Sequence, residues 1–150
     1  MRKWIIALSI LTIAGTSDGG VKYAGPDADA IRKAAMDYCE SWYTGDAERM
    51  ENCLHPELAK RIIRKDEKGR SRLDNMGAMT LVQYTRAAWG PKTPKDQQQK
   101  EVMILDVYGN VASAKAVMAG WIDYLHLAKI DGEWKIVNVL WEVKPKAGEN

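Results

Sequence analysis

The last third of the chain consists of apolar, strand-like runs that are interrupted at two tight-turn signals. Residues 101–120, EVMILDVYGNVASAKAVMAG, form two runs on either side of Gly109-Asn110. Residues 121–143, WIDYLHLAKIDGEWKIVNVLWEV, form two more on either side of Asp131-Gly132. Glycine beside asparagine or aspartate readily adopts the backbone of a two-residue hairpin turn. The sequence therefore predicts that this part of the chain forms a sheet, an antiparallel meander of four strands.

The residues before the meander show helical periodicity. Apolar side chains recur every three or four residues between Pro26 and Gly45, which predicts a first helix that stops at the glycine. Asp46 can cap a second helix, which Pro56 ends. A third helix is predicted over residues 80–89, and the segment LAKRIIR, residues 58–64, reads as a short strand.

Helices followed by strands predict an α+β domain in which three helices pack on one face of an antiparallel sheet. A sheet that is covered on one side only should alternate between apolar and polar residues. The last strand does not, because Trp134, Ile136 and Leu140 alternate with the equally apolar Val137, Val139 and Trp141. We therefore expect a second copy of the chain to cover the other face, giving a homodimer through the sheet.

The N-terminus has the layout of an export signal. Arg2 and Lys3 precede the apolar run WIIALSILTIA, whose eleven residues are too few for a membrane span of roughly 20. The predicted organisation is a signal peptide at 1–15, a linker at 16–26, a domain at 27–144 and a tail at 145–150. The mature protein would be periplasmic or secreted, without a stable membrane span, and its N-terminal sequence tests this prediction.

Net charge argues against nucleic-acid binding. The whole chain carries 22 basic and 20 acidic residues, so its formal charge is 22 − 20 = +2. Removal of Arg2 and Lys3 with the signal leaves 20 − 20 = 0, and a neutral domain lacks the positive surface that binds phosphate backbones.

The two cysteines do not form a metal or redox motif. Cys39 and Cys53 lie on neighbouring predicted helices, where either a disulfide or two buried thiols would fit. Their spacing is not that of a CxxC pair, and with only two separated histidines no zinc pattern appears. We expect neither a metal nor a cofactor.

Two segments resemble a known family. YCESWYTGDAERMENCLHPEL, residues 38–58, resembles the first two helices of the nuclear transport factor 2-like superfamily. DYLHLAKIDGEWKIVNVLW, residues 123–141, is similar to the last two strands of the branch labelled "putative lumazine-binding". The resemblance implies a cone-shaped fold, in which a curved sheet wraps around three helices and encloses a cavity, and dimerisation through the sheet. The branch label implies a pterin-like ligand.

Tyr38 is the main candidate that the resemblance supplies. In the similar steroid isomerases, a tyrosine at this spacing from Asp46 donates a hydrogen bond to the substrate oxygen. Those enzymes also need a carboxylate base on the first strand, where this chain has Ile62. Tyr38 is therefore either a ligand contact or a core tyrosine whose hydroxyl has a protein partner.

The other candidate ligand contacts are aromatic or titratable. His126 shares a strand face with Tyr124, whereas Asp123 points the other way, so Tyr124 and His126 face either the cavity or the partner subunit. The complete set of candidate ligand-binding residues is Tyr38, Trp42, Tyr84, Trp89, Tyr124 and His126.

Three functions are consistent with these features. The leading interpretation is an exported domain that binds a small aromatic or apolar molecule in an internal pocket. The second is a SnoaL-like lyase, isomerase or cyclase that uses Tyr38 and His126. The third is a structural dimerisation module, which would lack a cavity of the usual ligand size of about 300 Å³ or more.

Overall fold

The computed structural model describes residues 23–145. The predicted export signal lies outside the described residues, as do most of the predicted linker and tail. Within the linker, the Tyr23 hydroxyl donates to Asp106 Oδ1 at 2.9 Å, and a helix begins at Pro26. No helix among these residues has the length and apolar character that a membrane crossing requires.

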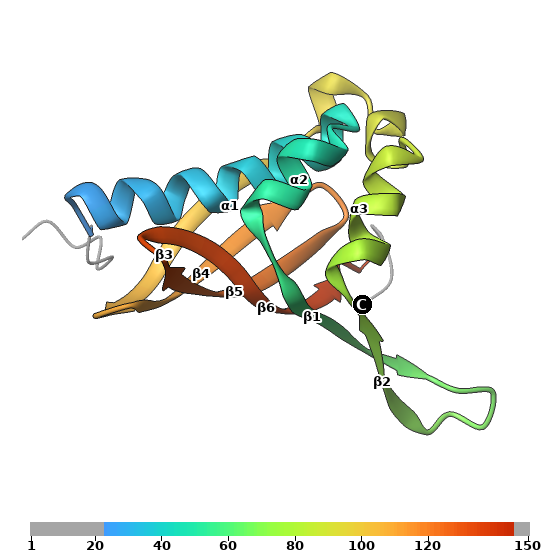
Figure 1. Cartoon of the computed structure of the whole chain (residues 1–150). Helices are drawn as coiled ribbons and strands as arrows, with labels where there is room; N and C mark the ends of the chain where they lie inside the picture. Colours follow the sequence, from blue (N-terminus) through green and yellow to red (C-terminus); the bar gives the residue numbers. More distant parts are fainter. Residues whose placement is uncertain (1–22, 146–150) are drawn as a thin grey trace, which may run out of the picture.

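Three helices lie over one face of a six-stranded sheet (Figure 1). This confirms the predicted α+β architecture. The elements, in chain order, are α1 (Pro26–Thr44), α2 (Ala47–Cys53), β1 (Leu54–Lys65), β2 (Ser71–Met76), α3 (Ala78–Arg86), the short 3₁₀ turns η1 (Gly90–Lys92) and η2 (Lys95–Gln97), β3 (Lys100–Tyr108), β4 (Val111–Met118), β5 (Trp121–Ile130) and β6 (Glu133–Val143).

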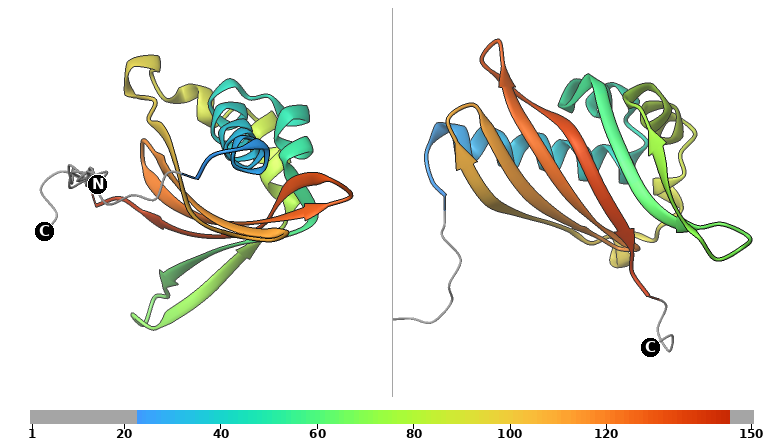
Figure 2. Two further views of the ribbon diagram at one scale, coloured as in Figure 1. Left: turned by 90° about the vertical axis from the view of Figure 1, so that its left-hand side faces the viewer. Right: turned by 90° about the horizontal axis from the view of Figure 1, so that it is seen from below.

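The sheet has the strand order β2-β1-β6-β5-β4-β3 and curves beneath α1 (Figure 2). The predicted meander of β3 to β6 is confirmed. The prediction of a wholly antiparallel sheet is wrong at one junction, because β1 pairs with β6 in parallel. The segment 58–64 is also part of a strand twelve residues long, which pairs with β6 along its inner edge and with β2 along its outer edge.

Small side chains are buried where α1 packs over β4, the second strand from the β3 edge of the sheet. Ala112, Ala114 and Ala116 of β4 are buried on the helix-covered face. Opposite them, α1 buries Ala34 and Ala35, among other residues. Alanine leaves little volume between the two backbones, so helix and sheet close tightly here and larger residues fill the core on either side.

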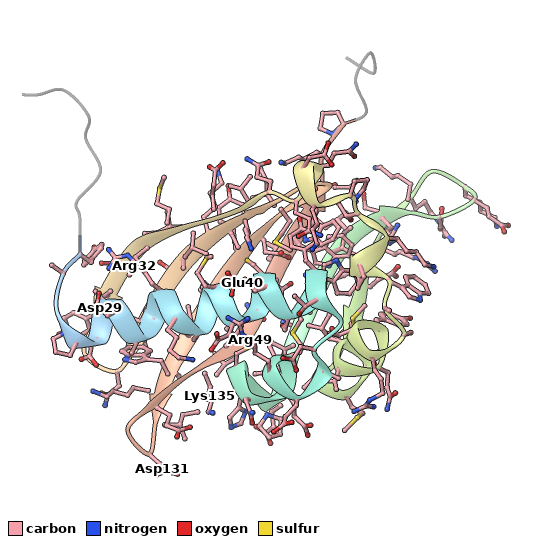
Figure 3. All side chains as sticks on the ribbon, turned by 90° about the horizontal axis from the view of Figure 1, so that it is seen from above. Asp29, Arg32, Glu40, Arg49, Asp131 and Lys135 are labelled. Carbon is pink, nitrogen blue, oxygen red and sulfur yellow. The ribbon has the colours of Figure 1, made fainter. Side chains whose placement is uncertain are left out.

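The junction of α1 and α2 follows the sequence prediction. Gly45 takes the left-handed conformation at the end of α1, with φ 75°, and the Asp46 side chain accepts from Arg49 N–H at 3.0 Å. The Arg49 guanidinium then reaches back to Asp37 and Glu40 of α1, and Figure 3 shows Arg49 and Glu40 side by side. These ion pairs fasten α2 against the preceding helix.

The third helix is displaced from its predicted position. It begins at Ala78 after Gly77, so Thr80 lies inside its first turn rather than at its cap. It ends at Arg86, because Ala88 adopts a left-handed backbone with φ 55°. Trp89 therefore lies beyond the helix, although it was expected on it.

A bulge in β6 changes which side chains share a face. His126 pairs with Asn138 and Leu127 with Ile136, which leaves Val137 as an extra residue. Strict alternation fails at this point, and Val139 and Trp141 join Trp134 and Ile136 on the helix side, while Leu140 is on the outer face. The prediction that Leu140 shares a face with Trp134 is therefore wrong.

Gly90 lies against the end of α1. A Cβ atom at this position would overlap the Trp42 carbonyl oxygen, whereas Gly120 has no atom within 4 Å of such a Cβ. We expect Gly90→Ala to reduce the free energy of unfolding by about 1–3 kcal/mol, as overpacking does, because backbone must move. Gly120→Ala is the matched control and should change it little. Urea denaturation measures both; equal effects would show that the contact with Trp42 is not restrictive.

Candidate functional site

A cavity of about 390 Å³ opens where the sheet curves away from the C-terminal half of α1. It lies between α1, α3, β1, β2 and the ends of β4 to β6. Its volume is within the range of small-molecule pockets. The lining residues are Tyr38, Trp42, Lys60, Ile62, Arg64, Asp74, Asn75, Met76, Leu81, Tyr84, Trp89, Met118, Trp121 and Trp141.

Six of the fourteen residues that line the cavity are aromatic. Trp121 lies between Trp42 and Trp141 and meets both edge to face, with ring centroids 5.6 Å and 6.2 Å apart. Tyr84 and Trp89 stack on each other, with centroids 5.0 Å apart and an interplanar angle of 17°. Such flat, apolar surfaces suit a planar ligand, which can stack against them or meet their edges.

Two polar residues of the cavity lining, Tyr38 and Lys60, meet Asp123, which is fully buried behind them. The Lys60 ammonium of β1 donates to Asp123 Oδ1 of β5 at 2.5 Å and to the Tyr38 hydroxyl oxygen of α1 at 2.8 Å. The indole N–H of Trp121 donates to the other carboxylate oxygen of Asp123 at 2.9 Å. We call Tyr38, Lys60 and Asp123 the polar floor.

The polar floor is almost inaccessible to water, which sets its protonation behaviour. The side chains of Lys60 and Asp123 are 6% and 0% exposed. Burial lowers the pKa of Lys60, an effect that the adjacent Asp123 carboxylate opposes. Burial, followed by the charge of Asp123, raises the pKa of Tyr38 well above its usual value, so the phenol stays neutral and keeps its proton. The Lys60 ammonium also lies 4.6 Å from the centre of the Trp141 ring, close enough for a cation–π interaction.

Counting donors and acceptors shows what the floor offers a ligand. An ammonium has three N–H donors, of which two bond to Tyr38 and Asp123. Tyr38 accepts from Lys60, and its own hydroxyl proton is directed to the Asp123 carboxylate, a hydrogen bond that adds to burial in raising the pKa of Tyr38, so the third N–H of Lys60 is the donor left for a ligand. The carboxylate charge of Asp123 already balances that of Lys60. The floor therefore suits a neutral hydrogen-bond acceptor, such as a carbonyl oxygen.

Four of the six residues predicted as ligand contacts line this cavity: Tyr38, Trp42, Tyr84 and Trp89. Tyr124 and His126 do not, since both are exposed on the outer face of the sheet. Leu125 and Leu127 alternate with them and are buried in the core on the helix side. This answers which face of β5 lies on the cavity side, a question that the sequence left open: Asp123, not His126, points toward Tyr38.

Sequence reasoning missed Lys60, which it placed in the short predicted strand at 58–64 without giving it a role in the site. A signal was present, because Leu58, Lys60 and Ile62 are spaced two residues apart and therefore share one strand face, which is buried. A lysine between two apolar residues on a buried face needs a partner, and Asp123 was a candidate on one of the two faces of its strand that the sequence left open. Although LAKRIIR was predicted as a strand, Lys60 could not be paired with Asp123 because the position of this strand beside β6 was unknown.

The two cysteines are free, buried thiols. Burial raises the pKa of each to about 12, so both stay protonated and act as small core residues. No cluster of three or more histidine, cysteine or carboxylate side chains that could hold a metal ion occurs within residues 23–145.

Comparisons with known proteins agree with this architecture. The family model described as "Putative lumazine-binding" matches residues 26–142. A nuclear transport factor 2-like protein of unknown function from Shewanella baltica OS155 superposes with a TM-score of 0.63 at 20% identity, covering 80% of this chain and 95% of that one. One from Methylobacillus flagellatus KT gives 0.59 at 21% identity, with 84% and 98% covered.

A further structural relative is a ketosteroid isomerase-like protein from Erwinia carotovora atroseptica SCRI1043, with a TM-score of 0.56 at 13% identity, covering 79% of this chain and 96% of that one. At these identities the likeness establishes the fold. No curated protein sequence matches the chain.

The buried ion pair generates a prediction about stability. Lys60→Met leaves the Asp123 carboxylate buried without its counter-ion, and Asp123→Asn does the same to Lys60. We expect each to reduce the free energy of unfolding by about 3–5 kcal/mol, measured by urea denaturation. The double variant Lys60→Met/Asp123→Leu should be less destabilised than either single variant, because it removes both charges.

Glu133→Gln is the control for this series, since it breaks the exposed pair with Lys135 and should leave stability near that of the wild type. Additive effects in the double variant would contradict the coupling of Lys60 and Asp123.

Proposed function

This chain belongs to the family described as "Putative lumazine-binding", within the nuclear transport factor 2-like fold, and we propose that it binds a small, flat molecule in its internal cavity. The observation that carries the proposal is an aromatic cavity that ends in a donor-rich polar floor. The ligand would be aromatic or apolar over most of its surface, with a carbonyl or similar acceptor at its buried end.

The dimensions of the cavity support a ligand of one or two fused rings. Its volume of about 390 Å³ exceeds the limit of about 300 Å³ below which a purely structural module was expected. Trp42, Trp121 and Trp141 offer ring surface along its length, and Trp89, 54% exposed, stands at its mouth. A pterin-like compound has this flat shape and carries ring carbonyls, so lumazine itself is one candidate.

The enzymatic alternative loses the residue pair on which it was based. Tyr38 is buried beneath α1, whereas His126 is exposed on the opposite face of the sheet. The two side chains therefore cannot act on one bound molecule, and this hypothesis in its original form is wrong.

Ligand binding is testable with lumazine and 2-acetonaphthone as probes. Either should quench the fluorescence of the cavity tryptophans on titration, and the ketone should bind more tightly than naphthalene, which lacks the acceptor. We expect Trp141→Ala to weaken binding about tenfold, since stacking on one ring contributes roughly 1–3 kcal/mol. Tyr108→Ala, which alters a residue 83% exposed outside the cavity, is the control. No saturable quenching by either carbonyl compound, or equal binding of naphthalene, would contradict the proposal.

We also propose that the protein is a homodimer through the outer face of its sheet. The views in Figure 2 show that no helix covers this face. One row of paired residues, Met103, Lys115, Tyr124 and Leu140, crosses it from β3 to β6. Of these, Met103 is 60% exposed and Tyr124 and Leu140 are each 48% exposed, so the outer face carries an exposed apolar strip that Lys115 interrupts. A two-fold axis would bring the strip onto itself in a partner.

Sedimentation velocity tests this assembly. The wild type should sediment as a dimer, and Leu140→Lys should produce monomers because it buries a charge in the interface. Met79→Lys places the same charge on α3, at an apolar residue that is 60% exposed and away from the sheet, and should leave the dimer intact. A monomeric wild type would refute the assembly.

A further inference from the structure

The polar floor contains a primary amine, that of Lys60, which is more reactive than a site that only binds a ligand requires. Lysine is among the residues least often buried, and a methionine or leucine at position 60 would fill the same space without an ionic partner. Instead, β1 directs a primary amine into an apolar cavity, with its side chain 6% exposed and its nitrogen 4.6 Å from the centre of the Trp141 ring. Desolvation in an apolar pocket activates a lysine amine as a nucleophile, and an adjacent carboxylate can accept and return the protons that the reaction moves.

We propose that Lys60 captures aldehydes or ketones covalently, by forming a reversible imine with the carbonyl carbon of a flat molecule bound in the cavity. This rests on the proposed function, because the aromatic walls must hold the carbonyl against the lysine. The same stacking that binds the ring would direct its carbonyl oxygen to the polar floor. The substrate class is thereby narrowed to aryl or cyclic carbonyl compounds.

The polar floor contains the groups that imine formation needs. The Lys60 ammonium first passes a proton to the Asp123 carboxylate, along the hydrogen bond of 2.5 Å between them. The freed amine adds to the carbonyl carbon, and the carbonyl oxygen takes up the proton from Asp123, while the Tyr38 hydroxyl supplies a hydrogen bond to it. The resulting adduct has a new C–N bond and a hydroxyl group.

Loss of water completes the step. Asp123 takes a proton from the nitrogen and returns it to the hydroxyl, the C–O bond breaks, and the nitrogen lone pair forms the C=N bond. The overall change is ammonium plus carbonyl to protonated imine plus water, with no oxidant or reductant. One positive charge remains beside Asp123 at the beginning and at the end, so the buried ion pair is conserved.

Burial favours the neutral amine form of Lys60, and Asp123 remains the ion-pair partner of its charged form. Burial lowers its pKa, which increases the fraction of neutral amine near pH 7 relative to an exposed lysine. The titratable groups facing it are Asp123 from β5 and Tyr38 and Cys39 from α1, and Arg64 and Asp74 line the same cavity nearer its mouth. Cys39 stays a neutral thiol because its pKa is about 12, so it does not compete as a nucleophile.

Reductive trapping tests the proposal. The full-length protein is incubated near neutral pH with 2-naphthaldehyde and sodium cyanoborohydride, and peptide mass mapping locates each naphthylmethyl group. We expect Lys60 to be labelled about tenfold faster than Lys65, an exposed lysine on the same strand, because the cavity holds the aldehyde against the Lys60 amine. The ratio should fall as the pH is raised toward 10, where exposed lysines also lose their protons.

Lys60→Arg keeps the positive charge but has no primary amine, and should lose the label at this peptide. Lys65→Met is the matched control and should label at Lys60 as the wild type does. If Lys60→Arg does not fold, the comparison of Lys60 with Lys65 within the wild-type protein still decides the question.

Non-covalent binding of 2-naphthalenemethanol, followed by tryptophan fluorescence, separates the two proposals. An alcohol that binds, together with labelling of Lys60 no faster than Lys65, overturns imine formation and leaves the binding function intact. Failure of the alcohol, the ketone and the aldehyde to bind overturns both.

Discussion

The packing of α1 across the curved sheet determines where this molecule can be hollow. Alanines on α1 and β4 bring helix and sheet together. The sheet continues to curve and α1 is straight, so the two must separate toward the C-terminal end of the helix (Figure 1). Bulky tryptophans line the space that results, without filling it, and α3 and the β1–β2 hairpin form its sides.

The polar floor is the second determinant, because it places charge where the fold provides almost no water. Two charges so deeply buried are tolerated since each has several partners: Asp123 accepts from Lys60 and Trp121, and Lys60 donates to Asp123 and Tyr38. The arrangement draws one residue from each of α1, β1 and β5. Its hydrogen bonds therefore link these three elements directly. The polar floor also gives an otherwise apolar cavity one polar end.

The parts of the fold that depend on local signals could be predicted from the sequence. Gly45 and Asp46 mark the end of one helix and the start of the next, and the turns at Gly109 and Asp131 define the meander. The parallel pairing of β1 with β6 could not be predicted, because it joins strands far apart in the chain and no local pattern encodes it. The bulge at Val137 was invisible for a similar reason: it interrupts the alternation on which the assignment of faces depended.

The same contrast between local signals and long-range pairing explains which residues of the site could be predicted. Tyr38, Trp42, Tyr84 and Trp89 were recognisable as aromatic residues on helices or beside them, and their positions near one end of the domain followed from the family likeness. Lys60 needed the partner strand to be known, since its meaning comes from Asp123, which is 63 residues away in the sequence. His126 and Tyr124 were equally balanced between two faces until the burial of Leu125 and Leu127 was seen.

The parallel junction also orders events when the chain is made. β1 is synthesised early, whereas its inner neighbour β6 is the last strand of the sheet. Nearly the whole domain must therefore be synthesised before Lys60 can be buried as it is in the folded domain. Until then the lysine and the apolar residues beside it face water. A chain truncated before β6 would lose Trp141 and the inner neighbour of β1 together, which makes the cavity the last feature of the domain to be completed.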